Sequence, residues 1–287
     1  MARKFGDRKD GVKLKKLHSM HVIMPLIFPN RCDNEAFVSD RIDLTNINTY
    51  LAKKNADHPE YAYNLFQVIV TAMLKTIVLR PKMNRFIANN TMYMHNDVSA
   101  SFTVKKIFSD DGAEALAQVR VKGAETIDDI HNEIFRQISF CRSEKLDGGT
   151  ESLNAVAAIP GFLKKIVGAG ARFLDRHGWM PSSVTEGDPF YGSVYLSNLG
   201  SIKLQAGYHH LTNWGTCSVF CTIGAIKKRP FYEEDGSVQV KECVDLGLTI
   251  DERIADGYYY SRTVQLLKKL LENPELLERP LNEEVEY

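Results

Sequence analysis

The first candidate site is a charged turn near the end of the chain. An apolar alternating stretch, Leu246 to Ile250, runs into residues 251–257, which hold three acids, one arginine and a glycine. Charges gathered at a strand end are costly to bury unless they are paired or used in chemistry. A structural interpretation is a salt-bridged corner, in which Arg253 neutralises two of the acids. Asp256 then caps the next helix, and Gly257 eases the turn.

The second candidate is the strand end from Ser197 to Ser201. A serine that ends a strand shortly before a glycine can place its hydroxyl over a cleft and stabilise an oxyanion. The alternative interpretation is an ordinary turn. A Gly-x-Ser-x-Gly elbow does not occur in the sequence, so a serine-hydrolase function lacks its signature.

The third candidate is the histidine pair His209-His210, in a polar and aromatic loop from Tyr208 to Trp214. Two adjacent side chains in a strand point apart, so joint metal binding is not expected. Surface or interface histidines are the alternative. The sequence contains no His-Glu-x-x-His motif, phosphate-binding loop or dinucleotide fingerprint, and no metal site is predicted.

The elements that position these residues alternate between strand and helix patterns along the whole chain. The clearest helix is predicted for residues 61–79, where apolar residues recur three and four positions apart and Pro81 ends the pattern. Further helices are predicted for 127–140, for 150–177 with a break at 159–161, and for 258–271. Strands are predicted for 18–27, 36–44, 85–87, 91–95, 98–108, 116–121, 193–197, 217–226 and 244–250, with turns at 110–112 and 235–236.

Composition sets limits on the class of protein. The 287 residues are 44% hydrophobic, enough for a substantial core, and 36 basic residues balance 36 acidic ones, which gives no reason to expect nucleic acid as a partner. Cys217 and Cys221 lie four apart in a strand-like run, so we interpret them as reduced thiols facing the core. Reduced thiols fit a cytoplasmic protein.

The ends of the chain and its most apolar window bear on domain organisation. Residues 1–17 are charged and lack an apolar core, so they are interpreted as an N-terminal arm, not as a secretory signal. Residues 18–287 are predicted to form one α/β domain. The window 155–174 is too interrupted to span a membrane, but its mixed apolar and basic character leaves open an amphipathic segment at a membrane surface.

Three segments together resemble one known family in the right order. Tyr195 to Gly200 resembles the Ser-Asn-Leu-Gly strand of the catalytic domain of dihydrolipoamide acyltransferases, the core subunits of 2-oxoacid dehydrogenase complexes. Thr222 to Pro230 is similar to a later strand and basic turn of these proteins. Leu246 to Gly257 resembles their Leu-x-Leu-x-x-Asp-His-Arg-x-x-Asp-Gly signature. The resemblance covers residues 20–275 and is strong after Gly192.

The resemblance implies a fold and an assembly. The implied fold is a two-layer α/β sandwich with a mixed β-sheet, similar to chloramphenicol acetyltransferase. The implied assembly is a homotrimer, or a higher assembly of trimers, with active sites in channels between subunits. The implied substrate is coenzyme A or an acyl-CoA, with no metal.

The resemblance also implies roles for individual residues. Ser197 falls on the serine that donates a hydrogen bond to the oxyanion, and Asp256 on the residue that supports the site. Glu252 falls on the histidine that acts as general base. The substrate-binding candidates are Asn198, Gly200 and Arg253.

Glu252 departs from the family pattern. A thiol has a pKa of about 8.5, a histidine about 6.5 and a glutamate about 4.3, so the change widens the proton-transfer mismatch by about 2 units or about 3 kcal/mol. This difference corresponds to about a hundredfold in rate. Three interpretations remain: Glu252 is a retuned base, His210 or His209 supplies the base, or catalysis is lost and a trimeric binding or scaffold protein remains.

We therefore expect a stand-alone CoA-dependent acyltransferase. The sequence shows no lipoyl domain and no Ala/Pro-rich linker, so we do not expect it to build a dehydrogenase complex by itself. The expected acceptor is a small molecule or a carrier that offers a thiol or hydroxyl group.

Overall fold

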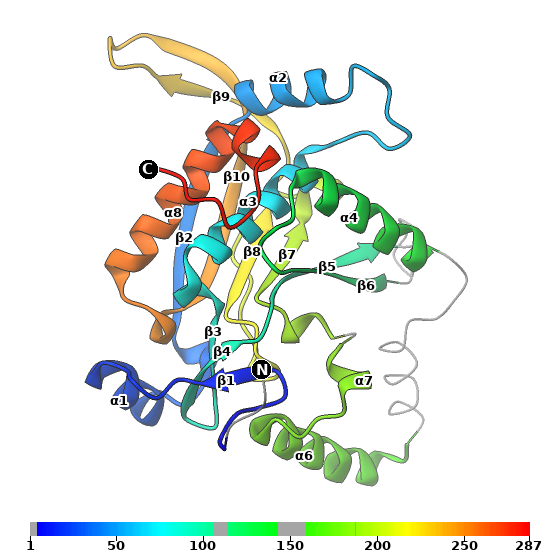
Figure 1. Ribbon diagram of the computed structural model, residues 1–287, viewed down its shortest axis with the longest axis vertical. Coiled ribbons are helices and arrows are strands. Elements are labelled where there is room, and N and C mark those ends of the chain that lie inside the picture. The colour runs from blue at the N-terminus through cyan, green and yellow to red at the C-terminus, as the bar shows by residue number, and fades with distance from the viewer. Residues whose placement is uncertain (1–4, 106–113, 143–158, 187) are drawn as a thin grey trace.

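The main sheet of the protein combines parallel and antiparallel strands (Figure 1). The computed structural model describes residues 5–105, 114–142, 159–186 and 188–287. The strands follow the order β2-β10-β8-β7-β5-β6, and β9 pairs with the outer part of β10. Their bounds are β2 Glu35–Asp43, β5 Val98–Lys105, β6 Glu114–Val121, β7 Val194–Asn198, β8 Val219–Ile223, β9 Lys227–Tyr232 and β10 Val238–Asp251. The pairs β5–β7 and β7–β8 are parallel and the others antiparallel, which confirms the predicted mixed sheet.

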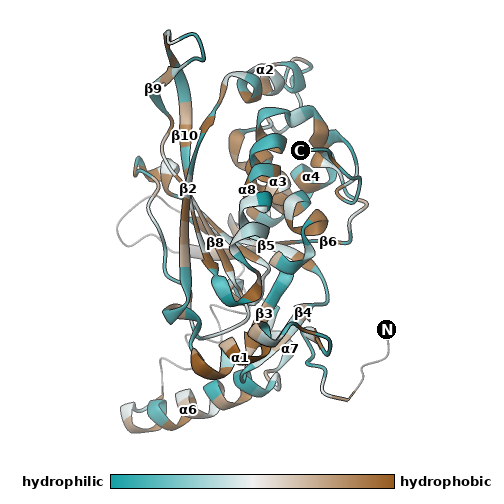
Figure 2. Ribbon diagram, turned by 90° about the vertical axis from the view of Figure 1, so that its left-hand side faces the viewer, coloured by the Kyte–Doolittle hydropathy of each residue, from teal (hydrophilic) through white to brown (hydrophobic). Residues whose placement is uncertain are grey.

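Helices cover one face of this sheet (Figure 2). They are α2 Thr45–Lys54, α3 Leu65–Leu79, α4 Ile127–Arg142 and α8 Gly257–Glu272. Helix α3 lies at the centre and is buried without interruption from Gln67 to Ile77, because it packs between the sheet and α8. The resulting two-layer α/β arrangement is the predicted fold class. Helix α3 begins at Leu65, four residues later than predicted, because Asn64 caps it and exchanges hydrogen bonds with Gln67.

A smaller sheet and several helices lie at the opposite end of the molecule from the β9–β10 hairpin (Figure 1). The small sheet has the order β1-β4-β3, with β1 Gly11–Lys13, β3 Arg85–Ala88 and β4 Thr91–His95. The helices are α1 Ser19–Ile27, α6 Gly161–His177 and α7 Ser182–Thr185. Part of the segment that the sequence suggests as an N-terminal arm lies on this body, where Arg8 is buried and donates to the carbonyl of Asp175.

The predicted strand at residues 18–27 is wrong, because this segment is helix α1. His18 accepts a hydrogen bond from the N–H of Met20 and caps the helix. The apolar residues that suggest a loose alternation also include a set at helical spacing: Met20, Ile23, Met24 and Ile27. Pro25 inside the segment hides this pattern, since proline usually ends a helix.

Other predictions can be compared within the described residues. The five cysteines are free, and Cys217 and Cys221 are buried, as predicted. The predicted turn at 110–112 and the first part of the helical stretch 150–177 lie outside the described residues. No helix in the part of the chain that the structure describes is long and apolar enough to cross a membrane.

Candidate functional site

The charged turn after β10 is held by a buried ion pair. Asp251 and Arg253 form two parallel contacts, at 2.8 Å from Nε to Oδ1 and 2.7 Å from Nη2 to Oδ2. The side chain of Asp251 is fully buried and that of Arg253 is 1% exposed. The Arg31 guanidinium, also buried, lies 3.7 Å from the same carboxylate. One carboxylate therefore faces two buried cations, and the turn is rigidly placed.

The two arginines also connect this turn to other segments. Arg253 donates to the carbonyl of Phe28, at the end of α1, at 2.7 Å. Arg31 donates to the carbonyls of Thr212 and Gly215 in the loop before β8. Burial lowers the pKa of Arg31, and the charge of Asp251 opposes that effect. The arrangement is the salt-bridged corner that the sequence suggests, except that Arg253 pairs with Asp251 alone.

Glu252 and Asp256 point away from this buried pair. Glu252 starts a short 3-10 turn (η5, Glu252–Ile254), its side chain is exposed, and its N–H donates to the carbonyl of Asn34. Asp256 accepts from the N–H of Tyr259 at 2.9 Å and caps α8. That hydrogen bond is the main cause that lowers the pKa of Asp256, whose carboxylate lies 3.9 Å from Lys82.

Ser197 lies at the other candidate site, at the end of β7. Its side chain is half-buried and lines a cavity of about 260 Å³. The cavity is also lined by Phe66, Phe102, Val104, Ile138, Asn198, Leu199 and Ile202. Asn198 accepts from the N–H of Ser201 and shapes the turn that follows. Gly200 lies against Gly224, where a Cβ would come within 2.6 Å of the carbonyl oxygen.

The sheet register keeps Ser197 and Glu252 apart within one chain. Ser197 pairs with Thr222 in β8, and Thr222 pairs with Gly247 in β10. Glu252 follows Gly247 by five positions, so it lies about 16 Å along the strand and about 10 Å across two strand spacings. The two residues are therefore about 19 Å apart. A reaction that uses both would need them from different copies of the chain.

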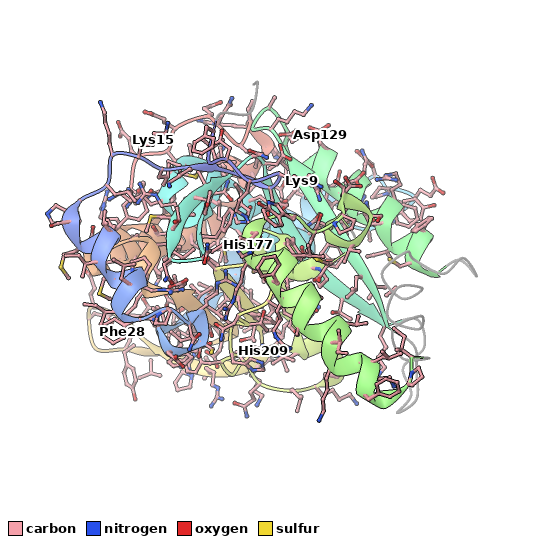
Figure 3. The ribbon with its side chains drawn as sticks, turned by 90° about the horizontal axis from the view of Figure 1, so that it is seen from below. Lys9, Lys15, Phe28, Asp129, His177 and His209 are labelled. Carbon is pink, nitrogen blue, oxygen red and sulfur yellow. The ribbon has the colours of Figure 1, made fainter. Side chains whose placement is uncertain are left out.

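The histidine loop lies over the face of the sheet that faces away from α3. His209 stacks on Phe220 of β8, with ring centroids 4.2 Å apart, and His210 is exposed (Figure 3 labels His209). Further along the loop, the N–H of Leu211 donates to the carboxylate of Glu35. Because Glu35 pairs with Asp251, the loop reaches the end of the sheet that carries Glu252.

One histidine beside the charged turn is not among the residues predicted from the sequence. His21 of α1 is half-buried, and its Nδ1 lies 3.1 Å from the carbonyl oxygen of Arg253. Burial is the main cause that lowers the pKa of His21, and the nearby cations Arg85 and Lys82 act in the same direction. The helical spacing within residues 20–27 was the sequence signal that could have identified its helix.

No candidate metal site is found among the described residues 5–105, 114–142, 159–186 and 188–287. No group of three or more His, Cys, Asp or Glu side chains there could hold an ion.

The comparison with protein families concerns the region that contains both candidate sites. Residues 183–278 match the model of the 2-oxoacid dehydrogenases acyltransferase (catalytic domain). The match includes the Ser197 strand and the charged turn, so the resemblance indicated by the motifs is confirmed. No curated protein sequence matches the chain.

Several solved structures share this fold, and the match to each of them extends over most of this chain. A probable dihydrolipoamide acetyltransferase from Listeria monocytogenes 4b F2365 is 16% identical, with a TM-score of 0.59 over 91% of this chain and 94% of that chain. The cubic core of a pyruvate dehydrogenase multienzyme complex is 13% identical, with a TM-score of 0.60 over 92% and 94%. A chloramphenicol acetyltransferase is 12% identical, with a TM-score of 0.55 over 91% and 99%. At these identities the likeness concerns the fold.

Proposed function

We propose that the protein is a CoA-dependent acyltransferase that moves an acyl group between a CoA thioester and a thiol or hydroxyl acceptor. The observation that carries the proposal is the family match over residues 183–278, within which Ser197 lines a cavity at a strand end. In this proposal the Ser197 hydroxyl donates to the oxyanion, and Asn198 and Gly200 shape the substrate site beside it. Asp256 supports the charged turn.

The proposed active site is completed between subunits. The support is the distance of about 19 Å between Ser197 and Glu252 within one chain, which follows from the strand register. A homotrimer, or a higher assembly of trimers, would bring Ser197 of one subunit to the charged turn of the next. In the same proposal residues 1–17 are an arm and residues 18–287 the catalytic domain. The location is the cytoplasm, which suits the free thiols of the chain.

A second candidate function is a trimeric binding or scaffold protein without catalysis. The observation that favours it is the position of the family histidine, which is occupied by Glu252 with an exposed side chain. Glu252 is not held by Arg253, because Asp251 engages that guanidinium. Both functions predict the same fold and assembly, so only binding and turnover of substrate separate them.

The experiment is calorimetric titration of coenzyme A and acetyl-CoA, followed by acyl transfer to dihydrolipoamide, pantetheine and cysteamine. We expect binding and transfer by the wild type, and a loss of about a hundredfold in kcat for Ser197→Ala, because one oxyanion donor is removed. Ser39→Ala, an exposed serine on strand β2, is the control and should match the wild type. A wild type that binds no CoA compound and transfers no acyl group supports the scaffold function instead.

A further inference from the structure

A histidine from a distant part of the chain contacts the backbone of the charged turn. His21 comes from α1, more than two hundred residues earlier in the chain, and its Nδ1 lies 3.1 Å from the carbonyl oxygen of Arg253. Arg253 directly follows Glu252, the position of the family base. An imidazole is therefore held against the segment of backbone where a base would be expected. The helix that carries His21 is itself tied to the turn through the bond from Arg253 to Phe28.

The hydrogen bond to Arg253 fixes the tautomer of the His21 ring. A carbonyl oxygen can only accept, so Nδ1 must carry the proton. In the neutral ring Nε2 then holds the free lone pair and can accept a proton. A histidine held in this way is oriented by one nitrogen and reactive at the other, as in many general bases.

His21 lines an open cavity of about 570 Å³ between α1, β3 and the start of α8. The charged and titratable groups that line the cavity with His21 are Lys16 and His18 just before α1, Lys82 before β3, Arg85 at its start, and Asp256 just before α8. The cations outnumber the single carboxylate, so the cavity favours an anionic ligand. The cationic surroundings also favour the neutral, basic form of the ring.

We infer that His21, not Glu252, is the general base of the proposed acyl transfer, and that its cavity admits the thiol of an anionic substrate such as coenzyme A. The inference rests on the proposed function. The thiol proton moves to Nε2 of His21, and the thiolate sulfur attacks the thioester carbonyl to form a new C–S bond. The oxyanion collapses, the original C–S bond breaks, and Nε2 returns the proton to the departing thiolate.

The test compares transfer from acetyl-CoA to dihydrolipoamide, pantetheine and cysteamine in four proteins. His21→Gln keeps an N–H donor for the Arg253 carbonyl but has no basic nitrogen. We expect its kcat to fall by about 10²- to 10⁴-fold, the range of general-base catalysis, with acetyl-CoA affinity within about threefold of wild type. Glu252→Gln should keep kcat within about twofold. His58→Asn, at an exposed position that does not line this cavity, is the matched histidine control.

Two further readouts separate a base from a structural residue. Wild-type kcat/KM should rise with pH with a midpoint below the ordinary histidine pKa of about 6.5, and His21→Gln should lose this limb. His21→Ala should regain activity when imidazole is added, because a free base then occupies the vacated space. In the absence of imidazole or another added base, His21→Ala should stay inactive.

The outcomes distinguish this inference from the proposed function. Full activity of His21→Gln, or a hundredfold loss in Glu252→Gln, overturns the role of His21 and leaves an acyltransferase. Loss of acetyl-CoA binding in His21→Gln also overturns it, because the residue then serves binding. A wild type that binds no acetyl-CoA and acylates none of the three thiols overturns the proposed function and the inference with it.

Discussion

Replacing Asp251 by asparagine should destabilise the protein strongly, because this carboxylate neutralises two buried cations. Asp251→Asn preserves the shape of the side chain but leaves Arg253 and Arg31 inside the protein without the charge they face. Removing one partner of a buried ion pair typically costs about 3–5 kcal/mol in the free energy of unfolding. For a chain of 287 residues the melting temperature should fall by about 5–8 °C.

The protein offers a matched control on the same strand. Asp245 pairs with Arg41 at 2.8 Å from Nε to Oδ1, the same distance as in the buried pair, but the side chains are 32% and 44% exposed. An exposed pair contributes about 0–1 kcal/mol, so Asp245→Asn should be nearly neutral. Urea unfolding of both variants at one protein concentration measures the difference. Equal free energies of unfolding for the two variants would refute the reasoning from burial.

Two other predictions concern stability. Burial lowers the pKa of His95 to about 4, so the unfolded chain binds a proton that the folded protein excludes when the pH falls from about 6.5 to 4. The free energy of unfolding should lose up to about 3 kcal/mol in that window, and His95→Gln should lose correspondingly less in urea titrations at both pH values. Gly247→Ala should cost about 1–3 kcal/mol, because its Cβ would overlap the carbonyl of Gly207. Gly257→Ala has free space around it and should be neutral or slightly stabilising in the same measurement; equal losses for the two variants would argue against the packing explanation.

The fold could be predicted largely because its periodic segments agree with their surroundings. Helices α3, α4 and α8 carry apolar residues at helical spacing, and the sheet buries the corresponding side chains of its strands. The segment of α1 was misjudged because most of its apolar residues are exposed, as Met20, Leu26 and Ile27 illustrate. Apolar residues also lie between the members of the helically spaced set Met20, Ile23, Met24 and Ile27, so that set contrasts little with its surroundings.

The candidate site was less accessible to sequence reasoning than the fold. The charged turn and the Ser197 strand are local motifs, so their residues can be recognised from their order. The partners that hold the turn are distant in sequence: Arg31 and His21 reach it from the first thirty-one residues. A contact between such distant residues depends on the tertiary path of the chain, which spacing within a motif does not encode.

The pairing of β2 with β10 has a consequence for how the chain acquires its structure. Asp43 lies opposite Cys243, so the strand at one edge of the sheet has its neighbour some two hundred residues further along. Loop closure over such a separation is slow, and the contact cannot form before β10 has left the ribosome. Until then β2 and β8 both lack the strand that lies between them. Synthesis of β10 is therefore the step that commits the nascent chain to its sheet.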